Sequence, residues 1–218
     1  VDTIQVAERS DGELLVWDGP RKGGKYSIAA DPAEGLAHGD WSTAQVVDQN
    51  GNQVAEYRAH VDPDLFAHHL KTLGKWYNKA LLIVERNNHG MLVNHKLARE
   101  IGYPRLYMEE AEDHMADGKV VRKYGWMTTT RTKPMVIDSL VAMVRDGVSG
   151  IVSRRLIEEM QTYIVADNGS TNAQAGKHDD LLMAYAIVQY VHSKSKKKRR
   201  HTTSKTDSYV PIDAIAGF

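Results

Sequence analysis

Tyr26-Ser27-Ile28-Ala29-Ala30-Asp31 is the stretch that decides the fold, because it is a short apolar run that ends on a carboxylate. Leu82-Ile83-Val84-Glu85 repeats the same arrangement further along the chain. Short apolar runs bounded by turn residues are typical of buried strands. If the two strands are neighbours in one sheet, Asp31 and Glu85 lie side by side at its edge.

A third acidic motif, His178-Asp179-Asp180-Leu181-Leu182, opens a strongly apolar run that is typical of a buried helix. A carboxylate at the start of this helix can reach the same sheet edge. Clustered carboxylates are the ligands that Mg²⁺ and Mn²⁺ prefer. Two such ions about 3.5–4 Å apart can hold a phosphodiester for in-line attack by water. The three motifs together predict a metal-dependent nuclease.

Each of these acidic residues also has an ordinary structural explanation. An aspartate that precedes a proline, as Asp31 does, is typical of a turn that ends a strand. Glu85 can pair with the adjacent Arg86, which would balance its charge. Acidic residues such as Asp179 and Asp180 cap the first turn of a helix and complement its dipole. The nuclease hypothesis therefore depends on the three motifs occurring together.

Three further residues lie in loops near these motifs. Asp40, in His38-Gly39-Asp40-Trp41, can bring another carboxylate to the metal edge, and a plain β-turn aspartate is the alternative. Lys177 and His178 can contact phosphate or the leaving oxygen of a substrate. For both, the alternative is a simple surface position in a glycine-containing loop.

The order of the remaining elements predicts an α/β fold. Apolar periodicity and turn signals favour strands near 14–17, 26–30, 43–48, 53–60, 80–84 and 105–108. Helices are expected over 62–77, 91–101, 130–144, 153–160 and 179–191, with a loop over 167–176. A hairpin-rich beginning followed by alternating helices and strands suits a central mixed β-sheet flanked by helices on both faces.

A polar, acidic stretch over 109–124 is expected to form a surface hairpin that turns at Asp117-Gly118. Its basic residues Lys119, Arg122 and Lys123 are candidates for contacts to DNA phosphates, in a hairpin that gates or guides the DNA. A hairpin whose charges are merely solvated is the alternative for each of them.

Composition excludes several other classes of protein. The 218 residues include no cysteine, which excludes disulfides and thiolate zinc sites. No apolar run approaches the roughly 20 residues of a membrane span, and the first residues lack the apolar segment of a signal peptide. A near match to a phosphate-binding loop over 19–26 ends in Tyr26 instead of Ser or Thr and precedes a strand, so we expect no nucleotide site. The first residue is Val1, so we expect a fragment or a processed chain.

The net charge of zero hides an asymmetry along the chain. Residues 194–218 hold seven Lys and Arg against two acidic residues, which leaves 21 basic and 26 acidic residues, a net charge of −5, in 1–193. A block of like charges favours disorder, and it can also contact phosphates. We therefore expect a lead-in segment over 1–24, one domain over 25–193, and a basic, disordered tail over 194–218.

The motifs over about 25–192, taken in this order, resemble the C-terminal nuclease domain of the large terminase of tailed bacteriophages, the DNA-packaging motor subunit. The matching pieces are Tyr26 to Asp31 with Gly39-Asp40-Trp41-Ser42, Leu82 to Asn87, Gly125 to Pro134, and His178 to Ala184. The combination is more specific than any single motif. The resemblance implies an RNase H-like fold with a central mixed sheet.

The resemblance also implies a two-metal acidic site that holds two divalent ions, Mg²⁺ or Mn²⁺. Asp31, Glu85 and Asp180 would be the catalytic metal ligands, with Asp31 bridging the ions. Asp179 and Asp40 would be auxiliary ligands or would support the ligands. The second position of the family is often Asp, so Glu85 is one methylene longer and its mode of ligation is left open.

The substrate implied is concatemeric double-stranded DNA, cut by a phage-encoded enzyme in the host cytoplasm during viral genome packaging. The partners implied are the N-terminal packaging ATPase of the same subunit, which is absent here, the portal and the small terminase. Three other interpretations stay open: another RNase H-like nuclease such as a resolvase or an RNA–DNA hybrid hydrolase, a non-catalytic DNA-binding or motor-docking module, and a domain that metal only stabilises.

Overall fold

A five-stranded sheet forms the centre of the computed structural model, which describes residues 12–112, 120–165 and 171–204. The strand order is β1-β4-β3-β2-β5. The strands are β1 (Leu14–Val16), β2 (Ser27–Asp31), β3 (Ser42–Val47), β4 (Gln53–Ala59) and β5 (Leu81–Val84). Strands β1 to β4 pair antiparallel, whereas β5 pairs parallel to β2. The predicted mixed sheet is therefore confirmed.

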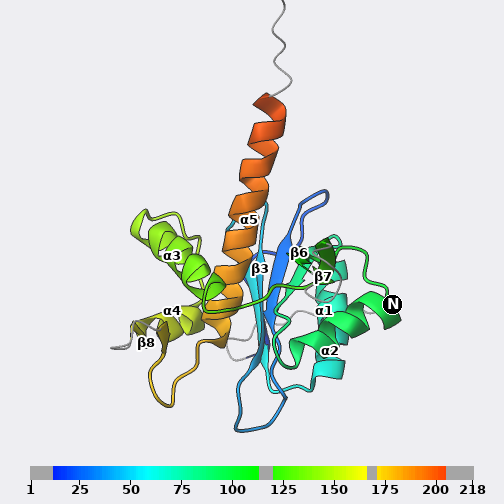
Figure 1. Cartoon of the computed structure of the whole chain (residues 1–218). Coiled ribbons are helices and arrows are strands. Elements are labelled where there is room, and N and C mark those ends of the chain that lie inside the picture. The colour runs from blue at the N-terminus through cyan, green and yellow to red at the C-terminus, as the bar shows by residue number, and fades with distance from the viewer. Residues whose placement is uncertain (1–11, 113–119, 166–170, 205–218) are drawn as a thin grey trace, which may run out of the picture.

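Helices cover both faces of this sheet, which Figure 1 shows edge-on. One face carries α1 (Pro63–Trp76) and α2 (Gly90–His95), which continues as a π-helical turn over Lys96–Glu100. The other face carries α3 (Thr132–Arg145), α4 (Arg154–Gln161) and the long α5 (Asp180–Ser204). The prediction of an α/β fold with helices on both faces is confirmed.

The alternation of side chains along the central strands builds two cores. Ile28 and Ala30 pack with α1 and α2, whereas Ala29 packs with α3, α4 and α5, and Ile83 of β5 joins Ala29. Because the period of a strand is two, the residue after Ala30 returns to the α5 face, and so does the residue two places after Ile83. Those residues are Asp31 and Glu85, so the strand pattern directs both carboxylates toward α5.

Local signals fix several helix starts where the sequence predicts them. Asp62 caps α1 through its side chain, which accepts a hydrogen bond of 3.0 Å from the amide of Leu65, and Ser153 caps α4 through the amide of Leu156 at 3.1 Å. The start of α2 lies so close to β5 that a Cβ on Gly90 would stand 1.7 Å from the carbonyl oxygen of Glu85. Only glycine allows this approach, which places α2 beside the end of β5.

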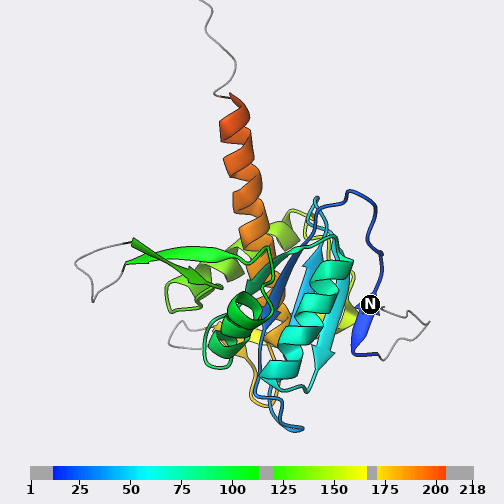
Figure 2. The ribbon, with the colours of Figure 1, turned by 90° about the vertical axis from the view of Figure 1, so that its right-hand side faces the viewer.

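Two short hairpins lie outside the central sheet. Strands β6 (Met108–Glu112) and β7 (Val120–Tyr124) form the predicted surface hairpin, which projects from the body in Figure 2. Strands β8 (Tyr163–Val165) and β9 (Thr171–Ala173) form the second. The predicted turn at Asp117-Gly118 lies outside the described residues.

Four predicted element boundaries are wrong. The strand expected over 105–108 is reduced to a single bridge between Leu106 and Leu82, and Met108 begins β6 of the hairpin. Strand β9 falls within the expected loop over 167–176, and α3 begins at Thr132 instead of residue 130. Helix α5 continues past residue 191 to Ser204, so the first part of the segment expected to be a disordered tail is helical. In the described residues, no helix is long and apolar enough to cross a membrane.

Candidate metal centre

Asp31 and Glu85 lie next to each other at one edge of the sheet because β2 and β5 are parallel neighbours. Ala30 pairs with Val84, and the amide of Glu85 donates to the carbonyl oxygen of Ala30 at 2.8 Å. The residues that follow this pair in register are the two carboxylates. Asn87 fixes the second one, since its side-chain amide donates to Glu85 Oε1 at 2.9 Å and to the Thr128 carbonyl oxygen at 3.0 Å.

Asp180 reaches the same edge from the first turn of α5, and three elements hold it there. The amide of Trp41, in the loop before β3, donates to Asp180 Oδ2 at 3.0 Å. The hydroxyl of Thr43 in β3 donates to the Asp180 carbonyl oxygen at 3.0 Å. From α4, the buried Glu159 accepts a hydrogen bond from the amide of Leu182 at 3.0 Å through Oε2. These contacts fix the N-terminus of α5 against the sheet.

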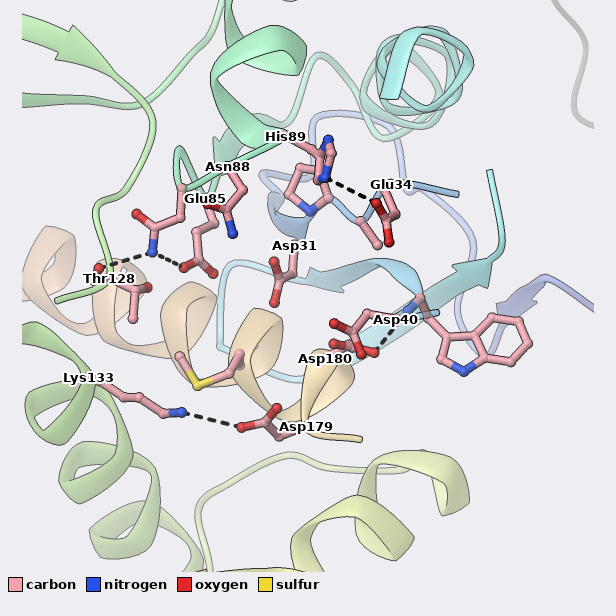
Figure 3. A pocket seen from close by; sticks show the side chains of 15 residues that line it. Asp31, Glu34, Asp40, Glu85, Asn88, His89, Thr128, Lys133, Asp179 and Asp180 are labelled. Atoms are coloured by element: carbon pink, nitrogen blue, oxygen red, sulfur yellow. Dashed lines mark hydrogen bonds and ion pairs between the residues drawn. The ribbon is translucent and has the colours of Figure 1, made fainter. Parts of the chain in front are cut away.

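Together the acidic residues line a polar pocket of about 410 Å³. Figure 3 shows Asp31 between Glu85 on one side and Asp40 and Asp180 on the other, with Asp179 facing the same space. The structure therefore brings together all five carboxylates that the sequence predicts as metal ligands. Their convergence is the feature that no single motif could establish.

The electrostatics of the pocket are those of a buried acidic cluster, in which the carboxylates outnumber the single ammonium of Lys133. Burial, and then the nearby charges of Glu85 and Asp180, raise the pKa of Asp31 well above its usual value. Burial also raises the pKa of Glu85, and it raises the pKa of Asp180 to about 6. A bound divalent cation would lower these pKa values again, since it stabilises ionised carboxylates. The available ligands are closely spaced carboxylate oxygens, which are hard donors that suit Mg²⁺ or Mn²⁺.

His178 lies close to two of these carboxylates, those of Asp40 and Asp180. Its Nδ1 is 3.5 Å from Asp40 Oδ1 and 3.7 Å from Asp180 Oδ2. One atom each of Asp40, His178 and Asp180 lie within 4.8 Å of one another, a spacing that suits ligands of a metal ion. The sequence assigns His178 to phosphate contacts, and the structure places it at the metal edge.

Lys133 is a pocket residue that the sequence prediction of the site missed. Its Nζ is 3.4 Å from Asp179 Oδ2 and 3.1 Å from Asn172 Oδ1. Its charge also lowers the pKa of Glu85, against the larger effect of burial. The available signal was its position in the stretch Gly125 to Pro134, one of the pieces that carry the family resemblance.

The predicted pairing of Glu85 with Arg86 is wrong. Arg86 instead lies 3.3 Å from Glu109 of β6, because successive residues after β5 point in opposite directions. This ion pair joins the sheet edge to the base of the hairpin. It leaves Glu85 free to face the pocket.

The remaining predicted DNA contacts that the structure describes do not line the pocket. Among the described residues, Lys177, Arg122 and Lys123 are exposed and do not line the pocket. Arg122 is 3.6 Å from Glu110 on the neighbouring strand of the hairpin. Lys119 lies outside the described residues. These positions are surface positions, and their contact with DNA stays a prediction.

Comparison with known proteins agrees with this geometry. Residues 28–190 match the family described as "Terminase RNaseH-like domain". The large terminase nuclease from thermophilic phage G20c, solved with bound magnesium, is 21% identical, with 84% of this chain and 88% of that chain covered and a TM-score of 0.62. The Thermus phage P74-26 large terminase nuclease domain is 20% identical, with 85% and 88% covered and a TM-score of 0.58.

The chain is also similar, at lower sequence identity, to a nuclease domain from a human virus. The human cytomegalovirus terminase nuclease domain, Mn-soaked and inhibitor-bound, is 12% identical, with 80% of this chain and 86% of that chain covered and a TM-score of 0.50. No curated protein matches the chain. The family match spans strands β2 to β5, the pocket and most of the buried part of α5. This chain is therefore a member of the terminase RNaseH-like domain family.

Proposed function

We propose that this chain is a metal-dependent endonuclease that cuts double-stranded DNA during viral genome packaging. The observation that carries the proposal is the convergence of Asp31, Glu85 and Asp180 in one pocket, with raised pKa values that a divalent cation would relieve. The large terminase nuclease from phage G20c has been solved with bound magnesium, cobalt or zinc, which supports a divalent cation as the cofactor.

Two divalent ions, Mg²⁺ or Mn²⁺, would be held by these carboxylates. Asp31 lies in the middle of the pocket, so it would contact both ions, with Glu85 on one side and Asp180 on the other. Asp40 and Asp179 would complete or support the two positions. When bound, such ions activate a water molecule and stabilise the leaving 3′-oxygen.

The chain's own contribution is to hold these groups in place before the substrate arrives. Asn87 orients Glu85, and the Trp41 amide orients Asp180. Lys133 brings a positive charge to a pocket that is otherwise acidic, where it can contact a phosphate oxygen of the DNA. Preorganised charge of this kind acts on the transition state without reorganisation during the reaction.

DNA would be bound mainly through its phosphates, so binding should weaken as the salt concentration rises. Lys119, Arg122 and Lys123 of the hairpin and Lys177 beside the pocket are the proposed contacts. In the whole packaging machine, the N-terminal ATPase of the same subunit, the portal and the small terminase would be the partners. The work would take place in the host cytoplasm.

The proposal is tested by incubating the chain with linear and supercoiled double-stranded DNA in Mg²⁺, Mn²⁺ or EDTA. Cleavage of duplex DNA that requires metal supports it. A strong preference for four-way junctions or for RNA–DNA hybrids would favour a resolvase or a hybrid hydrolase instead. A folded chain that binds DNA and cuts none of these substrates would favour a non-catalytic module, and metal that raises the melting temperature without any cleavage would favour a metal-stabilised domain.

Lys133→Gln should separate catalysis from metal binding. We expect cleavage to fall about a hundredfold, because one preorganised donor to developing charge is lost. Metal affinity should stay the same or increase, because the ammonium that competes for Asp179 is gone. Cleavage rates and calorimetric metal titrations measure the two effects, with Lys75→Gln, in the last turn of α1, as the control for loss of an exposed lysine. Equal cleavage by Lys133→Gln and the unaltered chain would contradict the assigned role.

A further inference from the structure

His178 holds a buried ring nitrogen beside two carboxylates of the pocket, and this nitrogen has no hydrogen-bond partner among the described residues. This atom, Nδ1, lies between the side chains of Asp40 and Asp180, at 3.5 Å and 3.7 Å from their nearest oxygens. A buried polar atom without a partner costs free energy, so it needs an explanation. The two neighbouring carboxylates could accept a hydrogen bond from this nitrogen, so the missing bond needs a physical reason.

A direct ion pair does not explain the arrangement well. Charge-assisted N–H···O bonds have heavy-atom distances of about 2.7–2.9 Å, and both His178 distances are clearly longer. The spacing is closer to that of three ligands around one cation, which a bound ion would draw slightly inward. Metal–nitrogen and metal–oxygen bonds of about 2.0–2.2 Å place neighbouring ligand atoms roughly 3.0–3.5 Å apart.

The two segments that supply these ligands are held in place by the rest of the chain. Trp41, adjacent to Asp40, stacks on His60 with ring centroids 3.5 Å apart, and the guanidinium of Arg58 lies 4.2 Å from the Trp41 ring centroid. The amide of Trp41 also binds Asp180. On the other side, the amide of Lys177 donates to the Gln174 carbonyl oxygen at 2.9 Å, which fixes the turn that enters α5. The site is therefore built before a cation binds.

We propose that Asp40, His178 and Asp180 form a mixed nitrogen–oxygen metal position in which His178 Nδ1 is a direct ligand. Imidazole nitrogen favours transition metals such as Co²⁺ and Zn²⁺, whereas Mg²⁺ prefers oxygen and gives up its water reluctantly. The opposite end of the pocket, at Asp31 and Glu85, offers only oxygen atoms. The two ends therefore differ in metal preference, and the Asp40–His178–Asp180 end selects a transition metal over Mg²⁺.

This inference refines the metal site of the proposed nuclease and rests on that proposal. It is tested on the DNA-free chain by titrating Co²⁺, followed by its visible absorption, and Mg²⁺, followed by calorimetry. The variants are His178→Asn, which removes the nitrogen ligand, and His178→Asp, which replaces it with oxygen. His89→Asn is the matched control, because His89 lines the pocket but its Nε2 faces Glu34 at 4.0 Å.

The expected result is a weaker and spectrally changed Co²⁺ complex in His178→Asn. Loss of a direct ligand should cost at least the roughly tenfold loss in affinity that follows removal of an outer partner of a ligand. Mg²⁺ affinity should change much less, so the Co²⁺ to Mg²⁺ affinity ratio should fall in both His178 variants. His89→Asn should keep the ratio and the spectrum of the unaltered chain. Circular dichroism confirms that each variant is folded.

The outcomes separate this inference from the proposed function. Co²⁺ affinity and spectrum that are unchanged in folded His178→Asn and His178→Asp would overturn the ligand assignment, while metal-dependent DNA cleavage by the unaltered chain would leave the nuclease proposal standing. Conversely, Co²⁺ binding that depends on His178 in a chain that cuts no DNA would keep the metal assignment and reject the nuclease.

Discussion

Asp31→Asn and Asp180→Asn should each lower metal-dependent cleavage of double-stranded DNA by about three orders of magnitude, which corresponds to about 4 kcal/mol of transition-state stabilisation. Asparagine has nearly the same shape as aspartate but lacks its charge, so it is a poor ligand for a divalent cation. Asp31 should be the more sensitive position, because it lies between the other carboxylates of the pocket. Initial rates on linear duplex DNA in saturating Mg²⁺ or Mn²⁺ measure the effect.

The matched control is Asp138→Asn, which makes the same chemical change on an exposed position of α3. This variant should cut DNA like the unaltered chain. Thermal unfolding must show that all three variants are folded. If either pocket variant keeps more than about a tenth of the rate, the residue is not an essential metal ligand, and the two-metal arrangement would have to be assigned to other groups.

The strand-end carboxylates could be predicted because their position follows from local pattern alone. An apolar run that ends on Asp31 or Glu85 fixes which face the carboxylate takes, once the strand period is known. The start of α5 was equally visible from His178-Asp179-Asp180. The sequence alone could not show that the two strands are neighbours. The structure shows it, because β2 pairs parallel with β5.

The residues that the sequence missed depend on tertiary contacts. Lys133 belongs to α3 and reaches the pocket only because α3 packs on α5. The Trp41 amide is a backbone group, so no residue type signals its bond to Asp180. Arg86 was assigned to Glu85 because the two are adjacent, but adjacent side chains after a strand diverge, and Glu109 from the hairpin takes its place.

Without metal, the contribution of the pocket carboxylates to the free energy of unfolding should increase as the pH is lowered. Burial raises the pKa of Asp180 from 3.8 to about 6 in the folded chain, whereas the unfolded chain keeps the ordinary value. Between these values the folded chain binds more protons than the unfolded chain, so the free energy of unfolding falls as the pH rises. The shift of about two units corresponds to at most about 3 kcal/mol, lost between about pH 4 and pH 7.

Asp180→Asn isolates this contribution, because asparagine cannot ionise. In EDTA at pH 8 the variant should be more stable than the unaltered chain by up to about 3 kcal/mol, and the difference should vanish near pH 4. Added Mg²⁺ should stabilise the unaltered chain, since a ligand that binds only the folded state shifts the unfolding equilibrium, and it should stabilise the variant much less. Urea unfolding at several pH values, with Asp138→Asn as the control, measures both effects.

A pocket variant that is less stable than the unaltered chain at pH 8 in EDTA would show that Asp180 stabilises the fold. In that case the ionised Asp180 beside Asp31 and Glu85 would not destabilise the metal-free chain, and metal binding would have no such cost to offset.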